Sequence, residues 1–456
     1  MLPKPLLNEH WIAPIFLSTP ALWVVLGCTL VFQLFVMRRL GFDRVTTLLV
    51  LAGTAVCIHY ATYTSVAERN YDGSSYVAYI RFIVEHGRLP DLPGCRFCTH
   101  PPLYYVLGAL WSGAVEHGNW IPRELGLQWF SLLLSFGFIV FALLMVRRTT
   151  DDSVTRWIAA LLVVFWPSSI IHSVRVHVDA LASLLMIAAV YWLAEWDWRG
   201  RSRHLYASLG CASLALLTKA SAYAVAATVV GFVFLQHRSK REGAGERVKR
   251  GVLVVLVLAS AGVLAAVLRD SGHTVCQALL GRSCYGRYVP PVADTPGRFL
   301  SFHPSDFLWR MDTVPTDPFL NRFLKSILFG VQPLGEDFAG SRYPIIATAL
   351  SALLLVTILV CAIGAVRLRA ESLQKYRVYL AAPVISFVFL VGFRVLAPNE
   401  FHEDFRHIFP ALAPFCIGYA KTVARFGHPS KGLSYAGTGI ALAIVVSSLA
   451  FFLRFG

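Results

Sequence analysis

The strongest constraint on this chain is a series of apolar runs, each about 20 residues long and almost free of charged side chains. A helix of about 20 apolar residues spans the ~30 Å hydrocarbon core of a bilayer and satisfies its own backbone hydrogen bonds there. The sequence contains twelve such runs, at approximately 20–37, 46–64, 128–146, 157–174, 180–196, 204–219, 220–236, 251–268, 343–365, 378–396, 407–424 and 434–453. It therefore predicts an all-α polytopic membrane protein, with about 12 transmembrane helices in a single domain over residues 1–456.

The composition agrees, because 56 % of the residues are hydrophobic and only 15 % are charged. Soluble domains average about 45–50 % apolar and about 25 % charged residues. An ordinary soluble enzyme, a disordered chain and a small disulfide scaffold are therefore excluded. Nineteen residues with one basic side chain, Lys4, precede the first run, so we expect a retained span there rather than a cleaved signal.

Basic residues concentrate in alternate loops between the runs. More than half of the 41 Lys and Arg residues lie in or beside six short loops, near 38–44, 147–156, 199–203, 237–250, 367–377 and 421–431. Short loops rich in Lys and Arg stay in the cytoplasm. Topology thus explains the net charge of +15, and no nucleic-acid partner is expected. The sequence therefore predicts a multi-pass membrane protein whose remaining loops face outward.

Two long loops, 65–127 and 269–342, then fall on the outward face, and both exceed what a simple connection requires. We expect both loops to carry short amphipathic helices. Within the first, the apolar stretch Pro101–Val115 is too short to span a bilayer, so we expect a helix along the outer face. An amphipathic run up to His86 precedes it, and its apolar residues recur at helical spacing: Tyr76, Tyr79, Ile80, Phe82 and Ile83. Large loops on one face indicate that the protein works there, and the loop 65–127 is predicted to be catalytic.

The cysteines outside the apolar runs all lie in these outward loops, which fits an oxidising compartment. Disulfides within sequence-local pairs are favoured, whereas a metal site built around Cys95-x2-Cys98-x-His100 remains the alternative. The predicted disulfide cysteines are Cys95, Cys98, Cys276 and Cys284.

Ionisable residues at membrane depth are costly and are functional candidates by default. Asp72 follows Tyr71 just beyond a span and ahead of a helix start, where it could equally be an N-cap. The motif His100-Pro-Pro-Leu-Tyr104-Tyr105 comes later in the same loop.

Three further outward segments carry candidates. Arg175, His177 and Asp179 lie between the fourth and fifth runs, where Asp179 could simply cap a helix and Arg175 could reach the head groups. Lys219 interrupts an apolar stretch and needs an anionic partner or the head-group layer. The turn before the eleventh run adds Glu403, Asp404, Arg406 and His407. No nucleotide-binding motif of the Walker or Rossmann type is present.

The order of these motifs resembles the GT-C superfamily of membrane glycosyltransferases. The likeness is to its bacterial branch near protein mannosyltransferases and lipid A aminoarabinose transferases. It covers residues 66–222 well and 390–415 loosely. It includes Tyr71-Asp72, the amphipathic helix ending in Gly-Arg-Leu-Pro, His100 to Tyr105, and the Leu-Leu-Thr-Lys turn ending at Lys219. An arginine before aromatic-Pro-Ala-Leu, here Arg406, completes it.

The resemblance implies a GT-C-like bundle that moves a hexosyl or pentosyl group, such as mannose or arabinose, from a polyprenyl-phosphate donor with inversion. The acceptor would be an extracytoplasmic protein such as pilin, an envelope glycan or a glycolipid, and membrane lipid would surround the enzyme. The enzyme would lie in the bacterial inner membrane as a multi-pass protein with its active site facing the periplasm. Asp72 would be the general base, and Arg406, Lys219 and Arg175 would hold the donor phosphate. The expected substrate-binding or supporting residues are Tyr71, His100, Tyr104, Tyr105, His177, Asp179, Glu403, Asp404 and His407.

A divalent metal ion stays open as a cofactor, with Asp72, His100 and Asp179 as candidate ligands. Gly73 stands where relatives often carry a second acid, which argues against a two-carboxylate metal site in this loop. Two other functions remain as alternatives: a transporter or flippase of lipid-linked sugars, and a non-catalytic scaffold for envelope assembly. The transporter predicts repeated halves with broken helices at the membrane midplane, and the scaffold requires none of the ionisable groups.

Overall fold

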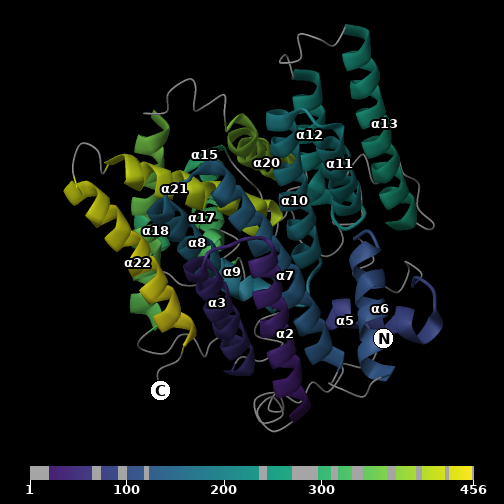
Figure 1. Ribbon diagram of the computed structural model, residues 1–456, viewed down its shortest axis with the longest axis horizontal. Helices are drawn as coiled ribbons and strands as arrows, with labels where there is room; N and C mark the ends of the chain where they lie inside the picture. Colours follow the sequence, from purple (N-terminus) through teal and green to yellow (C-terminus); the bar gives the residue numbers. More distant parts are fainter. Residues whose placement is uncertain are drawn as a thin grey trace.

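The computed structural model shows a bundle of helices that cross one another at varied angles (Figure 1). It describes residues 20–63, 73–90, 100–117, 123–235, 244–269, 296–309, 317–330, 343–366, 376–396, 403–426 and 431–453. These residues contain helices and turns but no strand. The predicted all-α class is confirmed for the described part of the chain.

Helices coincide with all twelve predicted apolar runs. They are α2 (Pro20–Arg39), α3 (Arg44–Tyr63), α7 (Arg123–Thr149), α8 (Ser153–Phe165) with α9 (Pro167–Ser173), α10 (Val178–Arg199), α11 (Ser202–Leu216), α12 (Tyr223–Leu235), α13 (Ala244–Arg269), α18 (Tyr343–Val366), α20 (Arg377–Leu396), η5 (Phe405–Ala411) with α21 (Leu412–Phe426), and α22 (Lys431–Phe452). By length and apolar composition, 6 helices of the described chain can cross a membrane, or 7 when the bent pair α8 and α9 counts as one span. The chain is a multi-pass membrane protein, and the count of about twelve spans stays a prediction.

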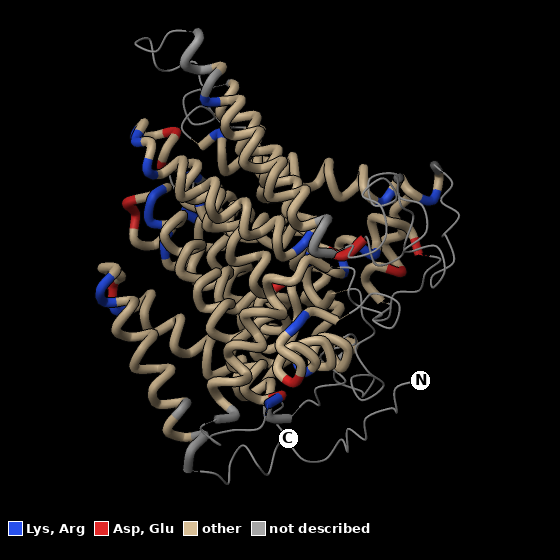
Figure 2. The backbone as a smooth tube through the Cα atoms, turned by 90° about the vertical axis from the view of Figure 1, so that its right-hand side faces the viewer, with Lys and Arg blue, Asp and Glu red and all other residues tan. Residues whose placement is uncertain are grey.

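The Arg-rich ends of several helices meet on one face of the bundle. Arg147, at the end of α7, donates from Nη1 to the carbonyl of Leu40 beyond α2 (2.5 Å). Arg148 pairs with Glu195 near the end of α10 (2.7 Å). Arg377, at the start of α20, donates to Asp197, which also lies on α10. Figure 2 shows several Lys and Arg segments along the left edge of the molecule. This clustering agrees with the positive-inside pattern, and the assignment of this face to the cytoplasm stays a prediction.

The fourth predicted span is broken. The chain bends by 50° between α8 and α9, at Trp166 and Pro167. Proline disfavours the α conformation of the residue before it, and Trp166 is accordingly extended (φ −64°, ψ 132°). Its indole Nε1 donates to the carbonyl of Ile327 (2.8 Å), so the break is tied to a distant helix. α9 is therefore a short helix, and the chain leaves it through the loop that leads to α10.

Three short helices, α15 (Pro296–Leu300), α16 (Pro304–Trp309) and α17 (Phe319–Phe329), come from the predicted loop 269–342. Most of α17 is buried, including the charged side chains of Arg322 and Lys325, and it packs against α9 and η5. The sequence predicts short amphipathic helices in this loop but not their burial. The burial of α17 inside the bundle is therefore a new finding, and α17 packs against η5.

Two helices described from the loop 65–127 also match the expectations. α5 (Gly73–His86) is amphipathic and buries Tyr76, Tyr79 and Ile80 against α6 (Leu103–His117). With 15 residues, α6 is about 22 Å long, shorter than the hydrocarbon core. The two helices lie together at the right of Figure 1.

Candidate functional site

Four separate segments bring their ionisable side chains together in one buried cluster. The loop after α9 supplies Arg175 and His177, and the first turn of α10 supplies Asp179. The turn between α11 and the 3-10 helix η2 (Ala220–Ala222) supplies Lys219. The 3-10 helix η5 supplies Arg406. These are the segments that the sequence singled out, so their convergence, although not their chemical roles, is now a structural fact.

Asp179 is the centre of the cluster and is itself buried. Its Oδ1 accepts a hydrogen bond from the ammonium of Lys219. Its Oδ2 lies 2.6 Å from His177 Nδ1 and 3.8 Å from Arg406 Nε. A buried carboxylate is stable only when opposite charges and hydrogen bonds replace its hydration. Asp179 therefore ties α10 to the turn after α11 and to η5.

His177 lies between Asp179 and Tyr76. Its Nδ1 lies 2.6 Å from Asp179 Oδ2 and accepts a hydrogen bond from the backbone N of Asp179 (3.2 Å). The Tyr76 hydroxyl lies 3.0 Å from its Nε2. Burial lowers the pKa of His177 below its usual value of 6.5, although Asp179 opposes the shift. The ring is therefore neutral at pH 7.

Arg406 is held by a second carboxylate, Asp404. The Asp404 side chain caps η5 by accepting from the backbone N of Arg406 (2.9 Å), and its Oδ2 lies 3.3 Å from Arg406 Nε. Arg406 Nη1 also lies 3.5 Å from His177 Nε2. The guanidinium is thus fixed beside Asp179, with a side chain that is about 10 % exposed.

Arg175 differs from the other cations of the cluster. Its side chain is buried, yet in the described part of the chain no carboxylate lies within 4.0 Å of it and its Nε has no hydrogen-bond partner. With His177 neutral, Arg175, Lys219 and Arg406 face Asp179 and Asp404. Among the described residues, the cluster therefore carries one excess positive charge, which an anionic group would neutralise.

Aromatic side chains from α5 and α6 cover one side of the cluster. The ring of Tyr76 makes an edge contact with His177 (centroids 4.6 Å apart) and is stacked with His100 (6.2 Å). Tyr105 is stacked on Tyr79 (3.8 Å), and Tyr104 packs edge-on against Tyr105 (5.7 Å). The predicted residues His100, Tyr104 and Tyr105 therefore lie in the wall beside His177.

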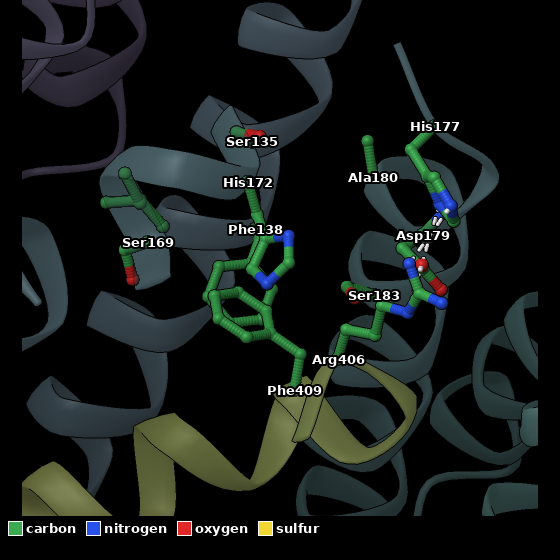
Figure 3. A pocket seen from close by; sticks show the side chains of 11 residues that line it. Ser135, Phe138, Ser169, His172, His177, Asp179, Ala180, Ser183, Arg406 and Phe409 are labelled. Atoms are coloured by element: carbon green, nitrogen blue, oxygen red, sulfur yellow. Dashed lines mark hydrogen bonds and ion pairs between the residues drawn. The ribbon is translucent and has the colours of Figure 1, made fainter. Parts of the chain in front are cut away.

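A small cavity opens between α7, α9, α10 and η5 (Figure 3). Arg406, His177 and Asp179 line one side of it, while His172 and Phe409 stand opposite. Its volume of about 20 Å³ is close to the space that one water molecule needs. The cavity alone is too small for a sugar.

Glu403 belongs to a second buried group that the sequence analysis did not identify. Its two carboxylate oxygens meet Arg394 Nε at 2.8 Å and Arg322 Nε at 3.1 Å. All three side chains are essentially inaccessible to solvent. The group joins α20 and α17 to η5. An arginine inside the predicted span 378–396 was the available signal for it, because charges at that depth are rarely unpaired.

His407 lies on η5, and its backbone N donates to the carbonyl of Asp404 (3.2 Å). Tyr71, Asp72 and the four loop cysteines lie outside the described residues, so the base and disulfide predictions stay predictions. Tyr76, which the sequence analysis placed only on an amphipathic face, is an additional member of the cluster. Among described residues, no three His, Cys, Asp or Glu side chains form a group that could hold a metal ion.

Neither the family models nor the curated proteins include a match to this chain. Solved structures do match. The archaeal oligosaccharyltransferase AglB from Archaeoglobus fulgidus, in complex with an inhibitory peptide and a dolichol-phosphate, superposes with a TM-score of 0.52 over 89 % of this chain at 12 % identity. Crystal structures of the same organism's oligosaccharyltransferase, one with Zn and sulfate and one tethered to an acceptor peptide, give a TM-score of 0.51 at 13 % and 12 % identity.

This chain covers 55 % of the AglB chain, so it corresponds to about half of that protein's length. At these identities the likeness establishes the fold alone. The chain therefore shares the fold of these oligosaccharyltransferases, which agrees with the predicted GT-C-like bundle. The bacterial branch named above stays a prediction.

Proposed function

We propose that this protein is an integral-membrane glycosyltransferase that transfers a sugar from a polyprenyl-phosphate donor to an acceptor outside the cytoplasm. The observation that carries the proposal is the buried cluster, whose described residues sum to one excess positive charge and in which Arg175 has no described carboxylate partner. A lipid phosphate would supply the missing negative charge. The AglB structure with dolichol-phosphate supports this ligand class, because that protein shares the fold.

The proposed reaction divides into two tasks for this chain. The acceptor hydroxyl attacks the anomeric carbon, the bond from that carbon to the phosphate oxygen breaks, and configuration inverts. The hydroxyl proton passes to a base, and the leaving lipid phosphate keeps the electron pair. Cations stabilise the charge that develops on the phosphate, and we assign this task to Arg175 with support from Arg406.

Asp72 remains the proposed base. α5 begins at Gly73, directly after Asp72 in the chain, and Tyr76 in its first turn reaches His177. The start of α5 is therefore next to the cluster. Asp179 is a poorer base, because accepting a proton would break its ion pair with Lys219. In this proposal Lys219 acts mainly by holding Asp179 in place.

The test is transfer from a synthetic polyprenyl-phosphate sugar by the purified protein in detergent, with the product measured by mass spectrometry. Transfer to acceptor would support the proposal, whereas movement of the lipid-linked sugar across liposomes without transfer would favour the flippase. Arg175→Gln should weaken donor affinity by roughly tenfold, the worth of one charge-assisted hydrogen bond. Arg81→Gln, at an exposed position on α5, is the matched control and should leave donor affinity unchanged. Equal donor affinity of the two variants would contradict the role of Arg175.

A further inference from the structure

A second, larger cavity lies at the Arg-rich face of the bundle, away from the candidate site. It is bordered by the turn between α2 and α3, the last turns of α7, and the first half of α8, and its volume is about 240 Å³. Arg147 on its wall lies nine residues beyond Phe138 of the other cavity, which is about 14 Å along α7. We call it the basic pocket, defined by Phe42, Asp43, Arg147, Arg156 and the apolar wall of Leu143 and Val146.

Two arginines give the basic pocket its charge. Arg147 is held in place, since its Nη1 donates to the carbonyl of Leu40 (2.5 Å) and its guanidinium lies over the ring of Phe42 (4.9 Å to the centroid). Arg156 comes from α8 and has a buried Nε with no hydrogen-bond partner. Within the described chain, neither guanidinium has a carboxylate within 4.0 Å. Both arginines therefore border the pocket without a direct ion pair.

Asp43 lines the same pocket but is already engaged. Its oxygens accept from the backbone N of Thr46 (2.9 Å), from the Thr46 hydroxyl (2.8 Å) and from Trp157 Nε1 (3.2 Å). Partial burial would raise the pKa of Asp43, but these hydrogen bonds outweigh it and lower the pKa below 3.8. Asp43 thus serves as the N-terminal cap of α3 and leaves the two arginines available.

Two other carboxylates on this face are already paired with arginines. Glu195 is paired with Arg148 and Arg199, and Asp197 with Arg377. The charge of the basic pocket is therefore a local excess, and it borders an apolar wall at a membrane face. A phosphate attached to a hydrophobic chain matches both features, because guanidinium groups bind phosphate oxygens in pairs. Basic pockets between membrane helices commonly bind anionic lipid head groups.

We propose that the basic pocket binds a phosphate group, presented by an anionic phospholipid of the leaflet beside the Arg-rich loops. Arg147 and Arg156 hold the phosphate oxygens, and Leu143 and Val146 contact the start of the acyl chains. A lipid bound there bridges the turn before α3 to α7 and α8. The site is separate from the glycosyl-transfer proposal and does not depend on it.

The test uses the full chain, purified in detergent and stripped of lipid. Binding of dioctanoyl phosphatidylglycerol and of inorganic phosphate is measured by calorimetry for the unaltered protein and for Arg156→Gln. The matched control is Arg39→Gln, which removes an exposed arginine from the last turn of α2 on the same face. Arg156→Lys is a second variant, which keeps the charge but loses the planar fork.

The lipid should bind at a saturable site, and Arg156→Gln should weaken it by roughly tenfold while Arg39→Gln leaves it unchanged. Arg156→Lys should lie between the two. Inorganic phosphate binding as tightly as the lipid would retain the phosphate site but overturn the lipid as its source. Equal lipid affinity of Arg156→Gln and Arg39→Gln would overturn the proposal as a whole.

Discussion

The pair formed by Lys219 and Asp179 allows a quantitative test of how the cluster holds the bundle together. Both side chains are buried, and they join the turn after α11 to the first turn of α10. Lys219→Met removes the ammonium and leaves the carboxylate of Asp179 buried with only His177 and Arg406 near it. Removing one partner of a buried ion pair costs about 3–5 kcal/mol.

Asp179→Asn should be costly as well, because it leaves the ammonium of Lys219 buried without its counter-charge. The double variant removes both charges together, so its cost should be smaller than the sum of the two single costs. The difference, the coupling energy, is expected at about 2–3 kcal/mol, the upper range for residues in direct contact.

Thermal unfolding of the purified protein in detergent, followed by tryptophan fluorescence, measures all four members of the cycle. The control pair is Arg81 with Glu85, one turn apart on α5, whose side chains are 64 % and 43 % exposed. Arg81→Gln should leave the unfolding temperature unchanged, because exposed pairs contribute little. Additive effects of Lys219→Met and Asp179→Asn, or a Lys219→Met protein as stable as the unaltered one, would refute the description of this pair as a structural tie.

Three further predictions follow from the fold and the sequence. Glu403→Gln should reduce the yield of folded protein in detergent chromatography, because it removes the carboxylate charge that faces the buried Arg322 and Arg394, at a cost of about 3–5 kcal/mol. A cysteine placed at Ala244 should resist membrane-impermeant labelling in intact cells, and labelling from outside would reverse the predicted orientation. Non-reducing mass spectrometry should find no free thiol at the four loop cysteines, whereas stoichiometric zinc with all four reduced would favour the metal alternative. These cysteines are Cys95, Cys98, Cys276 and Cys284.

Much of the helical framework could be predicted, because apolar runs and their charged ends depend only on local sequence. The amphipathic face of α5 is an example, since Tyr76, Tyr79 and Ile80 recur at helical spacing and are buried as expected. The segments of the site could also be located, because charges at the edge of a span stand out against an apolar background.

The pairing of those segments could not be predicted. The contact of Tyr76 with His177 joins residues 101 positions apart, and nothing in the local pattern of either residue indicates the other. The burial of α17 could not be predicted, because the sequence indicated only short amphipathic helices in that loop. By contrast, the bend at Trp166 was indicated in the sequence, because Pro167 follows it directly and a proline inside an apolar run interrupts a helix. The partners of Glu403 were likewise indicated only by the arginine inside a span.

We have proposed that the chain transfers a sugar and that Asp72 takes the acceptor proton. The most direct measurement compares Asp72→Asn with the unaltered protein in transfer from a synthetic lipid-phosphate sugar, with donor affinity and thermal stability measured in parallel. Asparagine caps a helix about as well as aspartate, but its amide cannot accept the proton at neutral pH. We therefore expect unchanged stability and donor affinity with transfer reduced by roughly 10²-fold or more. Near-normal transfer by Asp72→Asn would contradict the claim and would leave Asp72 as a helix cap.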